Sequence, residues 1–274
     1  MFPILSTIDE GWTAAVGFMR AYPRQSLLFV LVYLGAAGVG VGNFVVLPLP
    51  VWLAGLALTW GLGVTGLILL APVWTALYRY AVLGDRNRRY WQFDVRLWRV
   101  LVVMVVMALI MLIGAVPFAL GLDVLQLLGG RRMFVAGIVG FAFTVKALAF
   151  WLNARLAIAP AMGATGTRPQ AMDTSWAYTR WASAKILVML LLVYLPMLCA
   201  SAFFAILAVL FHAAPGSTGA MVLTVANVVT TTLVSALTDL VWGAITGRLA
   251  LKLVQAYRQR TVDLAKDQVA VDDT

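Results

Sequence analysis

The sequence predicts an all-α polytopic membrane protein with six transmembrane helices. Apolar side chains make up 63% of its 274 residues and charged side chains 11%, whereas a soluble domain has about 45–50% and 25%. Four apolar runs are bounded by charged residues, and together they have room for six spans of about 20 residues each. This composition excludes a soluble protein.

Two of the apolar runs are long enough for two spans, and the other two hold one span each. In chain order they are 25–78, 100–122, 133–154 and 186–247. Pro48 and Pro50 divide the first run, and turn-forming residues at 212–219 divide the last. The single membrane domain, 1–274, therefore consists of an N-terminal interfacial segment (1–25), a six-span bundle (26–258) and a cytoplasmic tail (259–274).

The distribution of lysine and arginine predicts the orientation. Seventeen of the 20 basic residues fall in the N-terminal segment, in the loops after spans 2 and 4, and in the tail. Basic residues near span ends favour the cytoplasmic side, so we expect both termini to be cytoplasmic in a bacterial inner membrane. The net charge of +9 then reflects topology and contact with anionic lipid headgroups rather than nucleic-acid binding.

The cytoplasmic ends of the even spans resemble one another. They read Arg79-Tyr-Ala-Val, Arg155-Leu-Ala-Ile and Arg248-Leu-Ala-Leu, each after a tryptophan four to six residues earlier. The tetrapeptide Leu-Val-Tyr-Leu also occurs twice, at 31–34 and 192–195. Either three repeated helical units or convergent rules for membrane interfaces account for these matches.

Short amphipathic segments are expected before the odd spans. Ser6 and Asp9 have the spacing of a capping box, as do Thr167 and Gln170. Residues 167–181 should form a helix in the headgroup plane, with Trp176 toward lipid or the bundle. The basic residues expected to meet headgroups are Arg79, Arg155, Arg168, Arg180 and Arg248.

The residues around the fourth span resemble a known family. The stretch Arg155-Leu-Ala-Ile-Ala-Pro-Ala-Met162 and then Ala171-Met-Asp-Thr-Ser-Trp-Ala-Tyr-Thr-Arg180, followed by an apolar span, is similar to the six-span membrane domain of some bacterial glycerophosphoryl diester phosphodiesterases and their stand-alone relatives. The family usually has a glycine where this chain has Trp181. The resemblance implies a helical, non-catalytic membrane module.

The sequence contains no recognisable catalytic or metal site. Its one histidine, His212, has no second ligand at metal spacing. Residues 61–66 match a dinucleotide fingerprint, but that motif requires a preceding strand, which a span cannot supply. We therefore expect no enzymatic activity, no cofactor and no metal.

Lys146 and Asp239 are the two charged residues within predicted spans. Each precedes the arginine of its span end by nine residues, which places both about 13–14 Å above the same interface. An isolated charge at that depth is costly, so we expect the two to form a structural ion pair, or else a polar site for a headgroup, an anionic solute or a proton. The remaining alternative is that the two side chains snorkel separately toward the interface.

Two functions remain open at this stage. The chain is expected to be a non-enzymatic inner-membrane module that binds lipid or a partner membrane protein. The alternative is a small transporter or channel that uses the Lys146 and Asp239 region.

Overall fold

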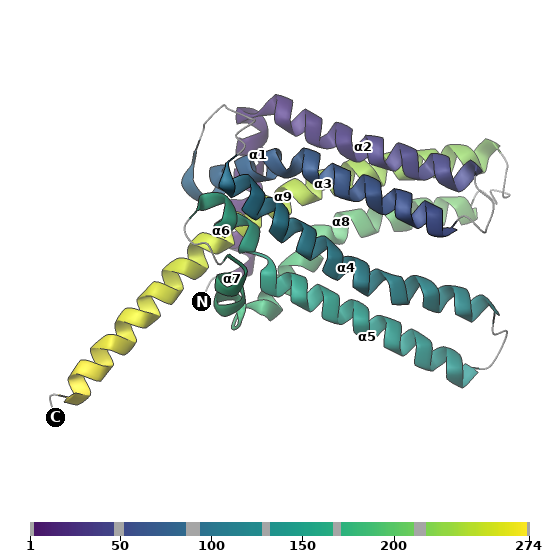
Figure 1. Ribbon diagram of the computed structural model, residues 1–274. Helices are drawn as coiled ribbons and strands as arrows, with labels where there is room; N and C mark the ends of the chain where they lie inside the picture. Colours follow the sequence, from purple (N-terminus) through teal and green to yellow (C-terminus); the bar gives the residue numbers. More distant parts are fainter. Residues whose placement is uncertain are drawn as a thin grey trace.

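The computed structural model describes residues 3–46, 52–85, 94–127, 132–166, 171–210 and 218–272, with side chains over most of these ranges. The described residues are helical apart from short connections, so the all-α prediction is confirmed. Figure 1 shows α2, α3, α8 and α9 running side by side, while α4 and α5 form a hairpin that diverges from them. The helices are α1 (Ile4–Ala21), α2 (Pro23–Val46), α3 (Trp52–Leu83), α4 (Val95–Leu127), α5 (Arg132–Leu156), α6 (Ala159–Thr165), α7 (Ala171–Thr179), α8 (Ser183–Leu210) and α9 (Thr218–Asp272).

Several helices are suited to a lipid environment. Within the described residues, four stretches are long and apolar enough to cross a membrane: Thr65–Leu83, Phe143–Thr165, Ser183–Phe204 and Met221–Tyr257. Large apolar side chains on α8 are exposed, as expected for contact with acyl chains. The first and third predicted spans coincide with α2 and α4, of which residues 37–46 and 114–127 lie outside the described side chains.

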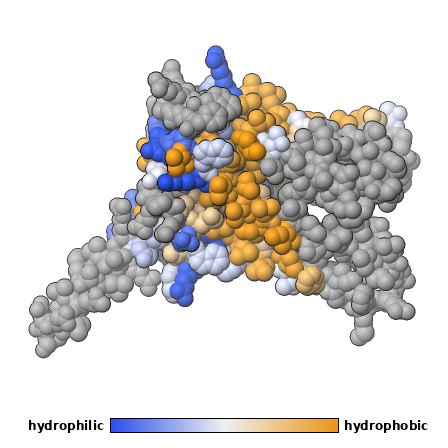
Figure 2. Space-filling model, in the orientation of Figure 1, coloured by the Kyte–Doolittle hydropathy of each residue, from blue (hydrophilic) through white to orange (hydrophobic). Residues whose placement is uncertain are grey.

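Helix α1 covers the end of the bundle where the charged residues gather. Figure 1 shows it at a steep angle to α2. One face of α1 is buried, through Thr7, Gly11 and Phe18 among others. Lys252 on α9 holds it in place, with Nζ 2.8 Å from Glu10 Oε1 and 3.2 Å from Thr7 Oγ1. Figure 2 shows hydrophilic side chains at this end of the molecule, beside a broad hydrophobic surface.

The start of α1 differs from the predicted capping box. The helix begins at Ile4 after Pro3, with no side-chain cap. Ser6 and Thr7 lie inside the first turn and donate their hydroxyl protons to the carbonyl oxygen of Pro3, at 3.3 and 2.8 Å. A hydroxyl near a helix start can bond backward to a carbonyl as readily as it caps an amide, which sequence spacing does not distinguish. The second expected capping box, at 167–170, lies outside the described residues.

Glycine and proline set the breaks between helices. Pro23 begins α2 directly after Tyr22, at a position where its missing N–H costs nothing. Gly84 and Gly166 have φ values of +67° and +69° and follow α3 and α6. This left-handed conformation strains residues that have a Cβ.

Glycines allow α9 to pack closely against α3 and α1. A Cβ on Gly243 would lie 2.4 Å from Cζ3 of Trp74 on α3, and one on Gly247 would lie 2.7 Å from Cβ of Ala81. On the other side, a Cβ on Gly11 of α1 would collide with Ile245. The spacing of Gly243 and Gly247 is the small-residue pattern that lets membrane helices approach closely.

Helix α9 continues beyond residue 258, where the bundle was predicted to end. It is 55 residues long and ends at Asp272, and Figure 1 shows its last part projecting away from the other helices. The segment at 259–274, expected to be a tail, is therefore helical over its described part.

Candidate functional site

The end of α5 holds an arginine without an acidic partner. Arg155 is only 5% exposed. Its guanidinium carbon lies 4.4 Å from the ring centre of Trp176 and 5.8 Å from that of Trp151. The buried Nε atom makes no hydrogen bond, and the described residues place no carboxylate within ion-pairing distance. The two tryptophan rings stabilise the cation, but its N–H groups have no acceptor among the described residues.

Helix α7 is fixed in place by the backbone of Arg155. The last carbonyl groups of a helix have no partner within it, and the carbonyl oxygen of Arg155 accepts hydrogen bonds from Ser175 Oγ at 2.9 Å and Thr179 Oγ1 at 2.7 Å. Both hydroxyl residues are fully buried. These bonds bring Trp176 over the guanidinium. The predicted helix within 167–181 is confirmed for Ala171–Thr179.

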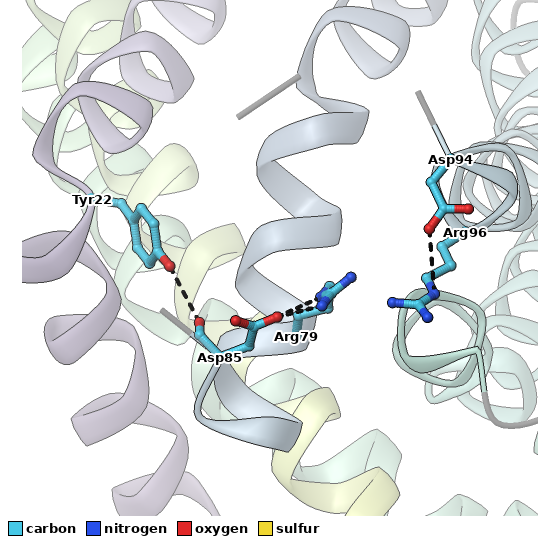
Figure 3. Close-up of polar contacts among 5 residues, drawn as sticks. All are labelled: Tyr22, Arg79, Asp85, Asp94 and Arg96. Atoms are coloured by element: carbon cyan, nitrogen blue, oxygen red, sulfur yellow. Dashed lines mark hydrogen bonds and ion pairs between the residues drawn. The ribbon is translucent and has the colours of Figure 1, made fainter. Parts of the chain in front are cut away.

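Two other arginines at this end, Arg79 and Arg96, are paired with aspartates (Figure 3). Arg79 donates from Nε to Asp85 Oδ2 at 2.9 Å and also from Nη2. Tyr22 Oη donates to the carbonyl oxygen of Asp85 at 3.2 Å. Arg96 Nε lies 3.4 Å from Asp94 Oδ2. Arg155 therefore differs from Arg79, which occupies the matching position in the sequence repeat.

The remaining predicted headgroup residues have different surroundings. Arg180 is exposed just after α7, with its guanidinium 5.5 Å from the ring centre of Trp181. The positive charge of Arg180 repels that of Arg155. Arg248 is partly buried and its Nε has no hydrogen-bond partner. Arg168 lies outside the described residues.

A second polar site surrounds Asp239 on α9. Tyr33 on α2 donates a hydrogen bond to Oδ2, and Tyr194 on α8 donates one to Oδ1. Each tyrosine is the third residue of a Leu-Val-Tyr-Leu tetrapeptide. The repeated tetrapeptide thus supplies both donors to one carboxylate, which the sequence comparison did not predict.

The ion pair predicted between Lys146 and Asp239 is not formed in this structure. Among the described residues, Asp239 bonds to tyrosines, and Lys146 Nζ lies 5.6 Å from the ring centre of Phe150 on its own helix. Helix α5 packs mainly on α4, whereas α9 packs on α1, α8 and α3. The nine-residue spacing predicts depth, but it does not determine which helices face one another.

An open, groove-like cavity of about 400 Å³ lies near Asp239, with Tyr33 and Ser235 in its wall. Its lining is rich in hydroxyl groups and comes from α2, α8 and α9: Tyr33, Met197, Ser201, Thr231, Thr232 and Ser235. Polar residues recur on α9 at steps of four, as Asn227, Thr231, Ser235 and Asp239, and therefore lie along one side of the helix. Of this row, Thr231 and Ser235 line the cavity.

An aromatic column leads from this site toward the charged end of the bundle. Tyr33 stacks on Phe29 with ring centres 4.9 Å apart, Phe29 meets the edge of Trp74 at 5.2 Å, and Trp74 stacks on Tyr78 at 5.8 Å. Trp74 is the tryptophan that precedes Arg79 in the sequence repeat. It is 6% exposed and forms part of the core against Gly243.

Comparison with protein-family models, with curated proteins and with solved structures found no match. The resemblance to the phosphodiesterase membrane domain therefore stays a prediction. Within the described residues no three histidine, cysteine or acidic side chains lie together as metal ligands.

Proposed function

We propose that this chain is a non-enzymatic, six-span module of the bacterial inner membrane that binds anionic lipid headgroups at its cytoplasmic face. The observation that carries the proposal is the Arg155 guanidinium, which is buried beside the rings of Trp151 and Trp176 and has no acidic partner among the described residues. A buried charge without a counterion is costly. A lipid phosphate would supply both the charge and the hydrogen-bond acceptors that Arg155 lacks.

The surroundings of Arg155 suit a phosphate at a membrane surface. Guanidinium groups bind phosphate oxygens through two parallel N–H donors. Trp151 and Trp176 are 38% and 41% exposed, and tryptophan is favoured at the level of lipid headgroups. Arg180 adds a second positive charge on the exposed side. The excess of basic residues on this side supports its assignment to the cytoplasm, where anionic lipids are attractive partners.

Lipid binding by purified protein in nanodiscs tests the proposal. Arg155→Gln removes the charge but keeps the backbone carbonyl that holds α7. We expect this variant to bind phosphatidylglycerol about tenfold more weakly, the loss expected for a charged hydrogen-bonded contact. Arg96→Gln is the matched control, because Asp94 already neutralises that arginine.

Native mass spectrometry with phosphatidylglycerol and phosphatidylcholine gives the readout. Retention of phosphatidylglycerol by Arg155→Gln at the wild-type level would overturn the proposal. An equal loss in both variants would also overturn it, because the effect would then come from net charge alone. Arg155→Lys should recover part of the affinity, since it restores the charge without the planar donor pair.

A partner membrane protein and a transport function are two further possibilities for this chain. A partner membrane protein is the other ligand that we propose for this module, and the family resemblance implies that the module is not catalytic. A small transporter or channel is the second candidate. The hydroxyl-lined cavity beside Asp239 favours it, whereas the separate position of Lys146 removes the cationic half of the predicted site.

A further inference from the structure

Three of the five hydroxyl groups that line the cavity beside Asp239 have only acceptor positions left. A hydroxyl group has one proton to donate and two lone pairs to accept with. Three of the lining hydroxyls have already given their protons to the protein: Tyr33 to Asp239, Ser201 to the carbonyl oxygen of Met197 at 3.1 Å, and Thr231 to that of Asn227 at 2.6 Å. A molecule in the cavity can therefore donate hydrogen bonds to the free lone pairs of these three oxygens.

A further acceptor lies one turn along α9. The Oδ1 atom of Asn227 is buried and receives no hydrogen bond. Buried polar atoms are usually paired, so an unpaired acceptor needs an explanation. Its place before Thr231 extends the acceptor-rich side of α9 away from Asp239.

The ionisable side chain beside the cavity is acidic. Asp239 lies one hydrogen bond behind the wall, through Tyr33, and one turn beyond Ser235. The described residues place no cation within ion-pairing distance of its carboxylate, since Lys146 lies on α5 beside Phe150. A hydroxyl that donates to a carboxylate becomes a stronger acceptor toward a third group. Charge and hydrogen bonding therefore favour the same kind of guest.

We propose that this cavity binds an organic ammonium ion. Its N–H groups would donate to the hydroxyl oxygens of Tyr33, Thr231 and Ser201, and its charge would offset that of Asp239. A volume of about 400 Å³ exceeds what a bare metal ion needs and falls in the range of small-molecule sites. Met197 provides apolar wall for the carbon skeleton. This inference is independent of the headgroup site at Arg155.

Calorimetric titration of the full chain in detergent tests the proposal with a matched pair of probes. Phenethylammonium chloride carries the charge and the N–H donors, and 2-phenylethanol has the same skeleton without the charge. We expect the wild-type protein to bind the ammonium at least about tenfold more tightly, a difference of about 1.4 kcal/mol. Equal affinity for the two probes, or binding of inorganic phosphate in preference to both, would overturn the proposal. This comparison requires no variant.

Substitutions then locate the site. Asp239→Asn should abolish the preference for the ammonium, whereas Asp94→Asn, at the other end of the bundle, should keep it. Ser235→Leu fills the cavity without changing any charge and should block both probes, which covers the case in which Asp239→Asn does not fold. An unchanged preference in both Asp239→Asn and Ser235→Leu would show that the ammonium binds elsewhere.

Competition with a lipid distinguishes a lipid headgroup from a free amine as the source of the ammonium group. In nanodiscs, competition by phosphatidylethanolamine would identify a lipid headgroup as the guest, and its absence would indicate a free amine. Loss of phenethylammonium binding in sodium chloride but not in choline chloride of equal strength would assign the cavity to a metal ion and overturn the proposal.

Discussion

Tyr33 and Tyr194 donate hydrogen bonds to opposite oxygens of the same carboxylate, that of Asp239, from the equivalent position of two identical tetrapeptides. Helices α2 and α8 thus approach α9 with the same local sequence. The arrangement gives the carboxylate two hydroxyl donors in a region where water is scarce, and unpaired polar groups there are costly.

The first prediction concerns these two bonds. Tyr33→Phe and Tyr194→Phe should each lower the stability of the folded protein by about 1–2 kcal/mol. This is the upper part of the range for hydrogen bonds within membranes, because the acceptor is a carboxylate. In an Asp239→Leu background both losses should shrink. Thermal unfolding in one detergent measures the cycle, and undiminished losses in that background would mean that the tyrosines act through packing alone.

The second prediction concerns Lys146 and Asp239. Since the two side chains do not meet, the effects of Lys146→Met and Asp239→Asn on thermal stability should add to within about 0.5 kcal/mol. A buried ion pair would instead make the double variant much more stable than the sum of the single losses indicates. Such coupling would show that the pair expected from the nine-residue spacing does form.

The third prediction concerns the close contact between α9 and α3. Gly243→Ala places a methyl group against Trp74 and Leu77, and this overpacking should destabilise the protein by about 1–3 kcal/mol. Gly140→Ala on α5 is the matched control, because a Cβ there meets nothing within 4 Å. Alanine is also the better helix former, so the control should be neutral or slightly stabilising. Equal melting temperatures for the two variants would contradict the packing described here.

The fourth prediction concerns topology. A reporter fused after Thr274 should be cytoplasmic, and one inserted at His212 should lie on the opposite side, because 17 of the 20 basic residues fall on the predicted cytoplasmic face. Alkaline phosphatase and a fluorescent protein, each active on one side only, provide the readout. Exposure of both sites on the same side would contradict the six-span arrangement.

The sequence predicted well what depends on local composition. Apolar runs bounded by charges predict the all-helical class, and the amphipathic pattern predicts α7. Arg155 and Trp176 were each assigned to the interface, but their contact was not predicted. The predicted features follow from hydropathy and helical period, which single segments carry on their own.

The sequence did not predict which helices are neighbours in the bundle or which of their faces meet. Lys146 and Asp239 share a depth but not a neighbour, because spacing from an arginine contains no information about rotation or adjacency. The repeated tetrapeptide does contain both tyrosine partners of Asp239. A search for hydroxyl residues on other spans that could bind the buried carboxylate would have identified them. The glycine spacing at Gly243 and Gly247 was a second sequence signal for a helix contact.

The length of α9 has a mechanical consequence. One continuous helix of 55 residues, about 80 Å long at 1.5 Å per residue, carries Asp239 within the bundle and projects beyond it at the other end. The glycine contact with α3 lies between these two parts. Because the projecting part is the longer one, a tilt of the whole helix about this contact would displace its far end more than it would displace Asp239.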